Sequence, residues 1–345
     1  MDARLRYAAF PAPRPGEVPL STASKIQVPA AGPASLYCTL YHRDPGFTEL
    51  AEAELSALGG GHSPEPGVWI SPVPIRWARC GYASAGGRQL ASSATLDGLE
   101  GELRALGLAA PRFSIEARRV PRGQTGSMAA KVRVGECIDG AVSEREPQLR
   151  LLLIVSPVGY RVLVDTDAED GESGWLAVSH KPHNYLVALP VRIAKAMLNL
   201  TARPGDTVLD PFCGTGTIPL LAAWAGHRSY GSDVSAACIA RAGENLAHFG
   251  REATLVCADA RVAEQPADCI VSNLPYGVYS HLARDAMRAI LRNLGRLSPR
   301  ATLVTSARID DDLRAEGYEI DQVIRVEPDR FTRLVYVTRA PASPN

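Results

Sequence analysis

The chain has 345 residues, of which 46% are hydrophobic, and its 37 basic and 37 acidic residues give a formal net charge of zero. This length predicts two or three domains with ordinary cores. The balanced charge excludes a chain that is basic throughout, but not a local basic face. The seven cysteines form no C-x-x-C pair, which disfavours a disulfide framework or a zinc site and favours a cytoplasmic location. No apolar run approaches the roughly 20 residues of a membrane span, and the N-terminus lacks a secretory signal.

The N-terminal half mixes strands and helices, which predicts small α+β units after a proline- and alanine-rich leader at 1–35. Hydrophobic periodicity predicts, in chain order, a strand at 35–41, a helix at 47–61, a strand-rich stretch at 67–83, a helix at 96–106, a basic strand at 112–120, a helix at 126–138 and strands at 149–157 and 160–167. The polar, glycine-containing stretch at 167–175 is the linker candidate.

The region 189–340 alternates short apolar strands with helices, which predicts an α/β fold with a mostly parallel, doubly wound sheet. The expected order is a helix at 190–200, a strand at 207–212, a helix at 217–226, a strand at 228–233, a helix at 235–250, strands at 254–260 and 269–277, a helix at 281–295, a strand at 301–307 and a terminal hairpin of 318–326 and 333–340.

The stretch VLDPFCGTGTIP, at 208–219, joins a strand end to a helix start. There Asp210 ends the strand, Gly214 and Gly216 allow close approach of a ligand, and the helix N-terminus offers free N–H groups. A dinucleotide site would need glycine at Pro219, and a carboxylate would repel a pyrophosphate. It suits a ligand with a positively charged amine. A purely structural glycine turn is the alternative.

Two more acids follow successive strand ends. Asp233 lies about 20 residues beyond the glycines, a spacing that suits ribose hydroxyls, with capping of the next helix as the alternative. Asp259 can accept from an adenine amino group, with an ordinary loop aspartate as the alternative. Together the three acids predict a ligand with an amine, a ribose and an adenine but no phosphate, and S-adenosylmethionine has those parts.

The stretch VSNLPYG, at 271–277, ends the fourth strand and should border the same crevice. The Asn273 side-chain oxygen and the Leu274 carbonyl can accept both N–H bonds of an exocyclic amine, which aims its lone pair at the methyl donor. Pro275 would hold the backbone rigid and Tyr276 would stack on the base. This is catalysis by positioning. A plain strand end followed by a turn is the alternative.

With DPFCGTGT and NLPYG in this order, residues from about 180 to 340 resemble class I, S-adenosylmethionine-dependent amino-methyltransferases, with Leu274 where the family usually has proline. The resemblance implies a Rossmann-like fold, release of S-adenosylhomocysteine and no metal. It also implies that the segment HKPHNYLVALP closes over the cofactor, with linker packing as the alternative. The implied cofactor-binding residues are Asp210, Pro211, Cys213, Gly214, Gly216, Asp233, Asp259, Ala260, Asn273, His180 and Pro182, with Tyr185 as a further candidate. The implied catalytic residues are Asn273, Leu274, Pro275 and Tyr276.

The N-terminal half resembles a THUMP domain, an RNA-binding module, through Phe113, the basic strand, the helix carrying Gly135 and Pro147 before a strand. The unit before it looks like the ferredoxin-like domain that accompanies THUMP in tRNA enzymes. The predicted domains are a leader at 1–35, a ferredoxin-like domain at 36–95, a THUMP-like domain at 96–168, a linker at 169–188 and a methyltransferase domain at 189–340.

Basic residues cluster in the THUMP-like stretch, with Glu116 as the main opposing charge. A local basic face can neutralise RNA phosphates, whereas a solvated, salt-bridged surface is the alternative. The resemblance implies that such a domain grips the tRNA acceptor end by shape. The candidate RNA-binding residues are Arg112, Arg118, Arg119, Arg122, Lys131 and Arg133.

The whole architecture is similar to tRNA guanine-N2 methyltransferases. The implied reaction methylates the exocyclic N2 of a guanosine in the acceptor stem or its junction with the D arm, after the base leaves its stack. A cytoplasmic monomer is expected, and whether a small activating subunit is needed stays open. The alternatives are an adenine-N6 RNA methyltransferase, a protein-glutamine methyltransferase and a non-enzymatic RNA-binding protein with a vestigial cofactor fold. The intact acids and asparagine argue against the last.

Overall fold

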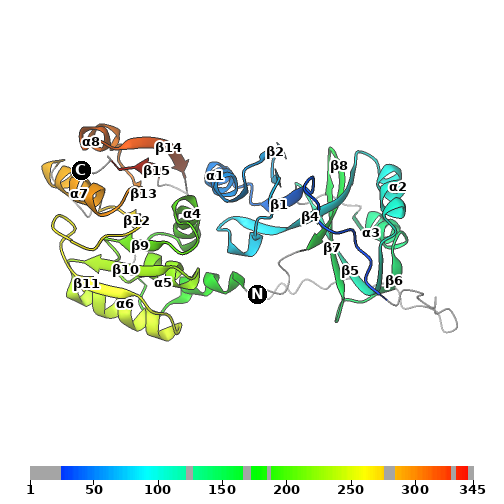
Figure 1. Cartoon of the computed structure of the whole chain (residues 1–345), viewed down its shortest axis with the longest axis horizontal. Helices are drawn as coiled ribbons and strands as arrows, with labels where there is room; N and C mark the ends of the chain where they lie inside the picture. The colour runs from blue at the N-terminus through cyan, green and yellow to red at the C-terminus, as the bar shows by residue number, and fades with distance from the viewer. Residues whose placement is uncertain are drawn as a thin grey trace, which may run out of the picture.

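The computed structural model describes residues 25–121, 127–165, 172–184, 188–275, 284–327 and 332–340. They form two α/β bodies that lie side by side, each built around its own sheet (Figure 1). The predictions for residues 1–24, Arg122, Tyr185 and Tyr276 concern positions outside the described residues. Residues 25–35 of the predicted leader run along the N-terminal body, where the Gln27 N–H donates to the Ala109 carbonyl at 2.7 Å.

The N-terminal body holds an eight-stranded sheet in the order β2-β3-β1-β4-β8-β7-β5-β6. Its elements are β1 (Tyr37–Tyr41), α1 (Thr48–Gly59), β2 (His62–Glu65), β3 (Val68–Ser71), the short 3-10 helix η1 (Trp77–Arg79), β4 (Ala83–Ser93), α2 (Leu96–Leu106), β5 (Ala109–Arg119), α3 (Ser127–Gly135), β6 (Asp139–Val142), β7 (Leu149–Ser156) and β8 (Gly159–Asp165). Helices α2 and α3 bury one face, and β1, β3, β7 and β8 contribute side chains to a cluster on the other.

Strand β4 is the main element that the periodicity did not predict, along with the short strands β2 and β6. Its sequence, ASAGGRQLASS, is small and polar because the strand runs between β1 and β8. A Cβ at Gly87 would lie 1.9 Å from the Val164 carbonyl oxygen, so only glycine fits there. Since β4 pairs with β8, the predicted units 36–95 and 96–168 share one sheet, and the boundary between them stays a prediction.

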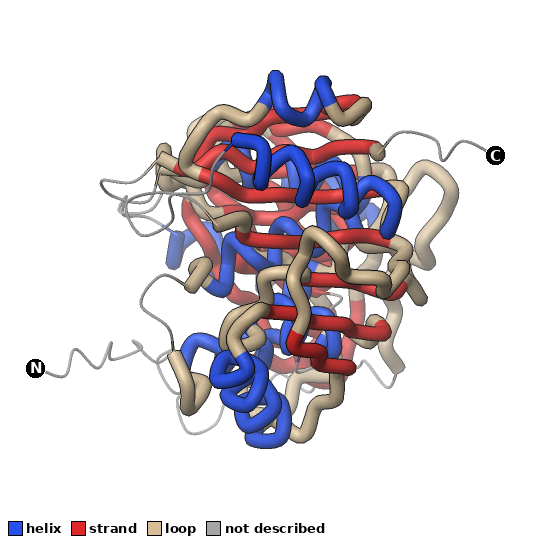
Figure 2. The backbone as a smooth tube through the Cα atoms, turned by 90° about the vertical axis from the view of Figure 1, so that its left-hand side faces the viewer, coloured by secondary structure: helices blue, strands red, loops and turns tan. Residues whose placement is uncertain are grey.

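The C-terminal body confirms the predicted doubly wound fold. Its seven-stranded sheet has the order β11-β10-β9-β12-β13-β15-β14, parallel from β11 to β13 and antiparallel beyond. Figure 2 shows strands lying one above another with helices running across them. The elements are α4 (Val191–Thr201), β9 (Thr207–Asp210), α5 (Thr217–Trp224), β10 (Arg228–Asp233), α6 (Ala236–His248), β11 (Thr254–Cys257), β12 (Cys269–Asn273), α7 (Arg284–Leu297), β13 (Arg300–Thr305), α8 (Asp310–Ala315), β14 (Glu319–Val326) and β15 (Arg333–Arg339). Of these, α8 was not predicted.

The two bodies are joined by a packed interface. Residues from α1 and from α4 share one hydrophobic cluster. Within it the buried Glu54 carboxylate accepts from the Gly81 N–H at 2.8 Å and from the Asn199 amide at 2.6 Å. The predicted linker contains the 3-10 helix η2 (Glu172–His180), whose buried Trp175 donates to the Ala78 carbonyl at 2.9 Å. The described part of the linker therefore contacts both bodies, because Trp175 bonds to the N-terminal body while η2 also lies against α4 and α5. No helix among the described residues is long and apolar enough to cross a bilayer.

Candidate functional site

The carboxyl ends of β9, β10, β11 and β12 meet at one edge of the C-terminal sheet, because these strands are parallel neighbours. Asp210 ends β9, Asp233 ends β10, Asp259 follows β11 and Asn273 ends β12. The structure thus brings the predicted acids and the predicted catalytic asparagine to the same edge, as expected from the strand order.

Asp210 lies at the centre of this edge and is only 2% exposed. Its Oδ1 accepts from the Ser272 hydroxyl at 2.7 Å and from the Phe212 N–H at 3.1 Å. Burial raises the pKa of Asp210 to about 7, and the negative charge of nearby Asp233 contributes to the increase. The two hydrogen bonds oppose it because they stabilise the ionised carboxylate. A buried carboxyl poised near neutrality is stabilised in its charged form by a cationic ligand.

The glycine turn leaves open space beside Asp210. Gly214 has a φ of +50°, and a Cβ there would meet nothing within 4 Å. Gly216, with a φ of +81°, stands at the start of α5, and a Cβ there would lie 3.0 Å from the Ala242 Cβ. Pro211 follows Asp210 in this turn, and Cys213 is buried with its N–H donating to the Ser232 carbonyl at 2.9 Å. The backbone conformation of the turn therefore favours glycine at both positions, and the main chain at Gly214 is open to a ligand.

Asp233 braces the glycine turn. One carboxylate oxygen accepts from the Gly214 N–H at 3.0 Å and the other from the Ser235 N–H at 2.9 Å. The N-cap of α6 is Ser235, whose hydroxyl accepts from the Cys238 N–H. Each Asp233 oxygen keeps a second lone pair, so the bracing role leaves it able to accept from ribose hydroxyls.

Asp259 is held by a neighbour that the sequence analysis did not consider. The Arg261 Nε lies 3.0 Å from both Asp259 carboxylate oxygens, and this ion pair lowers the pKa of Asp259. Ala260 is buried, and its carbonyl accepts from the Asn293 amide at 2.9 Å. A ligand amine at Asp259 would share the carboxylate with the Arg261 guanidinium or displace it.

Asn273 presents an unsatisfied acceptor at the end of β12. Its Oδ1 is buried and has no hydrogen-bond partner among the described residues. A buried acceptor without a hydrogen bond destabilises the folded protein unless a ligand or a water molecule donates to it. Leu274 is 1% exposed, packs in the core beside α7, and donates its N–H to the Val304 carbonyl at 3.0 Å. Proline has no N–H, so leucine at this position extends the β12–β13 ladder by one bond. The half-buried Pro275 follows it.

The linker segment touches the glycine turn through Asn245, a residue that sequence reasoning missed. Asn245 of α6 is fully buried, and its Oδ1 accepts from the His183 N–H at 2.9 Å. Its amide donates to the His183 carbonyl at 3.0 Å and to the Thr215 carbonyl at 2.8 Å. His180 and Pro182 lie in the same segment and are exposed. No local pattern marks a lone asparagine in an amphipathic helix as the anchor of a distant loop.

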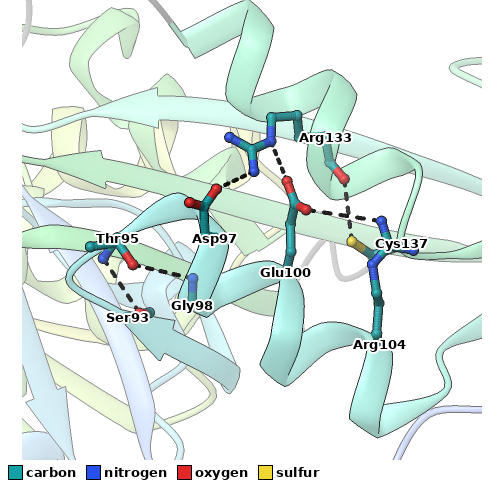
Figure 3. Close-up of polar contacts among 8 residues, drawn as sticks. All are labelled: Ser93, Thr95, Asp97, Gly98, Glu100, Arg104, Arg133 and Cys137. Carbon is teal, nitrogen blue, oxygen red and sulfur yellow. Dashed lines mark hydrogen bonds and ion pairs between the residues drawn. The ribbon is translucent and has the colours of Figure 1, made fainter.

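The described basic residues of the THUMP-like stretch mostly pair with carboxylates. Arg133 of α3 reaches both Asp97 and Glu100 of α2 (Figure 3). The other pairs are Arg112–Glu146, Arg118–Glu116 and Lys131–Glu144. Arg119 is half-buried at the end of β5. Exposed ion pairs contribute little to stability, so phosphates can replace the carboxylates at small cost, and the RNA-binding role of these residues stays a prediction. No group of metal-ligating side chains occurs among the described residues.

Comparisons with known proteins agree with this geometry. Residues 180–301 match the family described as RMKL-like, methyltransferase domain. The chain is 33% identical over 116 residues to a tRNA (guanine(10)-N2)-dimethyltransferase of Methanothermobacter thermautotrophicus, covering 32% of this chain and 34% of that one. It is 29% identical over 195 residues to the U6 snRNA (guanine-N(2))-methyltransferase THUMPD2 of Homo sapiens, covering 51% and 36%. These matches span about a third of the relatives' length.

Among solved structures, TrmN from Thermus thermophilus aligns with 88% of this chain and 99% of its own, at 25% sequence identity and a TM-score of 0.51. The C-terminal body therefore has a Rossmann-like fold, residues 180–301 match a methyltransferase domain, and the alignment with TrmN extends over the N-terminal body as well.

Proposed function

We propose that this methyltransferase domain transfers a methyl group from S-adenosylmethionine to the exocyclic N2 of a guanosine in RNA, with tRNA as the first candidate. The observation that carries the proposal is the buried Asn273 Oδ1 at the carboxyl edge, which has no hydrogen-bond partner among the described residues and lies beside Leu274 and Pro275. The names of the matched relatives support guanine N2 as the acceptor and leave tRNA and U6 snRNA as the two RNA classes.

The residues present fit this cofactor. Asp210 can pair with its ammonium group, Asp233 keeps lone pairs for the ribose hydroxyls, and Asp259 can accept from the adenine amine. The turn that would face it has open space at Gly214 and a buried Thr215 hydroxyl, for which the described part of the chain supplies no hydrogen-bond partner. When bound, S-adenosylmethionine supplies an activated methyl group and leaves as S-adenosylhomocysteine.

Asn273 then acts on the acceptor. Its Oδ1 accepts one N–H of the guanine amine, and the Leu274 carbonyl is proposed to accept the other. With both hydrogens held, the nitrogen lone pair is freed from the ring and aimed at the methyl group. The nitrogen gains the methyl and gives up one proton to solvent, so no strong base is required. Tyr276 is proposed to stack on the base.

The N-terminal body is proposed to hold the RNA. Because most of its described basic residues pair with carboxylates, binding would exchange carboxylates for phosphates and depend strongly on salt. The ferredoxin-like and THUMP-like identities, the monomeric state and the cytoplasmic location stay part of this proposal, and the need for an activating subunit stays open.

The test incubates the protein with methyl-labelled S-adenosylmethionine and unmodified bulk tRNA or a U6 snRNA transcript, followed by digestion to nucleosides. Label in N2-methylguanosine, lost in Asn273→Ala while cofactor binding persists, supports the proposal and tells which RNA is used. Label in N6-methyladenosine would overturn the guanine assignment. No label in either RNA, despite cofactor binding, would contradict the RNA substrate.

A further inference from the structure

A cavity of about 530 Å³ lies where the two bodies meet. The N-terminal body contributes Phe47 and Tyr82, η2 contributes Ala177 and His180, and the first turn of α4 contributes Arg192. This volume falls within the range of small-ligand sites, which occur preferentially at domain interfaces. Two of its lining residues, His180 and Pro190, belong to the segment HKPHNYLVALP, and no motif discussed above contains Phe47, Tyr82 or Ala177.

The cavity is close to the carboxyl edge of the catalytic sheet. Arg300 begins β13 and donates to the Thr201 carbonyl at the end of α4, at 2.6 Å. The C-terminal end of α4 thus lies at the amino edge of the sheet. The first turn of α4 lies about 15 Å from that end, because a helix rises about 1.5 Å per residue. His180 is three residues from His183, which is tied through Asn245 to the glycine turn. The cavity and the cofactor site are therefore neighbours.

The chemistry of the walls combines aromatic surface with positive charge. The Phe47 and Tyr82 rings stack with centroids 5.2 Å apart and an interplanar angle of 27°. Arg192 donates to the Gly81 carbonyl at 2.6 Å, and no described carboxylate forms an ion pair with it. The described lining residues include no acid. Aromatic rings beside a guanidinium are the groups that bind unpaired nucleotides, by base stacking and phosphate contact.

We propose that this cavity seats one unstacked nucleotide of the RNA, distinct from the target guanosine. This inference rests on the proposed function and adds a second nucleotide site to it. Because the walls come from both bodies and the packed interface holds them together, the nucleotide is gripped at a fixed distance from the carboxyl edge. The site would select RNAs in which an unpaired nucleotide lies at that distance from the methylated base.

The test measures RNA affinity without catalysis, by fluorescence anisotropy of labelled bulk tRNA and of the U6 snRNA transcript. Ala177→Trp fills the cavity from an exposed position and removes no side chain. Phe47→Ala removes one of the two aromatic side chains in the wall and leaves Tyr82. Ala247→Trp, exposed at the far end of α6, is the matched control. We expect the RNA Kd to rise about tenfold in the first two variants, as for loss of a stacked base, and to stay within about twofold in the control.

Cofactor affinity and thermal unfolding are measured on the same variants, and both should match the wild type in Ala177→Trp. An unchanged RNA Kd in Ala177→Trp and Phe47→Ala would overturn the nucleotide site. So would lost cofactor binding in Ala177→Trp, since the cavity would then belong to the cofactor. Wild-type protein that binds neither RNA overturns it too. RNA binding that depends on the cavity, without any methylation, would refute the proposed reaction alone.

Discussion

The buried carboxyl of Asp210 should make the free protein less stable as the pH rises. Its pKa lies at about 7 in the folded chain, compared with an ordinary aspartate value of 3.8. A raised folded pKa means that the folded state prefers the protonated form, so the ionised carboxyl is a stability cost that grows above pH 4 and levels off above pH 7. At about 1.4 kcal/mol per pKa unit, the full cost is about 4 kcal/mol, of which about 2 to 3 kcal/mol develops between pH 5 and pH 8.

Asp210→Asn keeps an oxygen to accept from the Ser272 hydroxyl but cannot ionise. We therefore expect the free energy of unfolding of the variant, relative to wild type, to rise by about 2 to 3 kcal/mol from pH 5 to pH 8. The assay is urea denaturation without cofactor at both pH values. The same variant should lose most of its affinity for S-adenosylmethionine, because the partner of the ammonium group is gone. A stability difference independent of pH, or unchanged cofactor affinity, would refute this reading of Asp210.

Four further substitutions test other contacts. Arg261→Ala frees Asp259 and should tighten cofactor binding by about two- to fivefold, as measured by calorimetry; weaker binding would indicate that the arginine itself contacts the cofactor. Leu274→Pro introduces the residue that is usual in the family this sequence resembles. It should lower the free energy of unfolding by about 3 kcal/mol in denaturant, because it removes the N–H that bonds to β13 and a buried side chain. An unchanged free energy of unfolding would contradict the role given to Leu274 in packing. Asn245→Ala removes the three hydrogen bonds that tie the linker segment to the glycine turn and should raise the cofactor Kd about tenfold, or about 1.4 kcal/mol; unchanged affinity would show that the tie is not needed. Glu54→Ala should lower the unfolding free energy by about 2 to 4 kcal/mol by stranding buried donors at the domain interface; a loss well below 1 kcal/mol would mean that water replaces them.

The alternating strands and helices of the C-terminal body were predictable because the central strands are short, apolar and buried, and their polar residues stand at the strand ends. Because the carboxyl ends of neighbouring parallel strands share one edge of a sheet, the sequence also predicted that Asp210, Asp233 and Asn273 lie together. Strand β4 escaped prediction because its small, polar residues are chosen by the close approach of β8 at Gly87 and carry no alternation. Its strand conformation depends on pairing with the neighbouring strands β1 and β8 rather than on its own residue pattern.

Contacts between residues that are far apart in the sequence likewise could not be predicted. Asn245 meets His183 across 62 positions, and Arg133 meets Asp97 across 36, so neither pairing leaves a local signal. The sequence therefore left two interpretations of the basic cluster open, an RNA-binding face and a salt-bridged surface, and the structure pairs most of its described members with carboxylates. The cavity between the two bodies also depends on tertiary packing, because Phe47 and Arg192 are brought together only by the interface of α1 with α4.

The most direct test of the central claim is the identity of the methylated nucleoside formed by wild-type protein and by Asn273→Ala under matched cofactor saturation. The account predicts N2-methylguanosine from the wild type and a loss of at least about a hundredfold in the variant, as expected when a positioning group is removed. N2-methylguanosine formed equally well by Asn273→Ala, or a different labelled nucleoside, would contradict it.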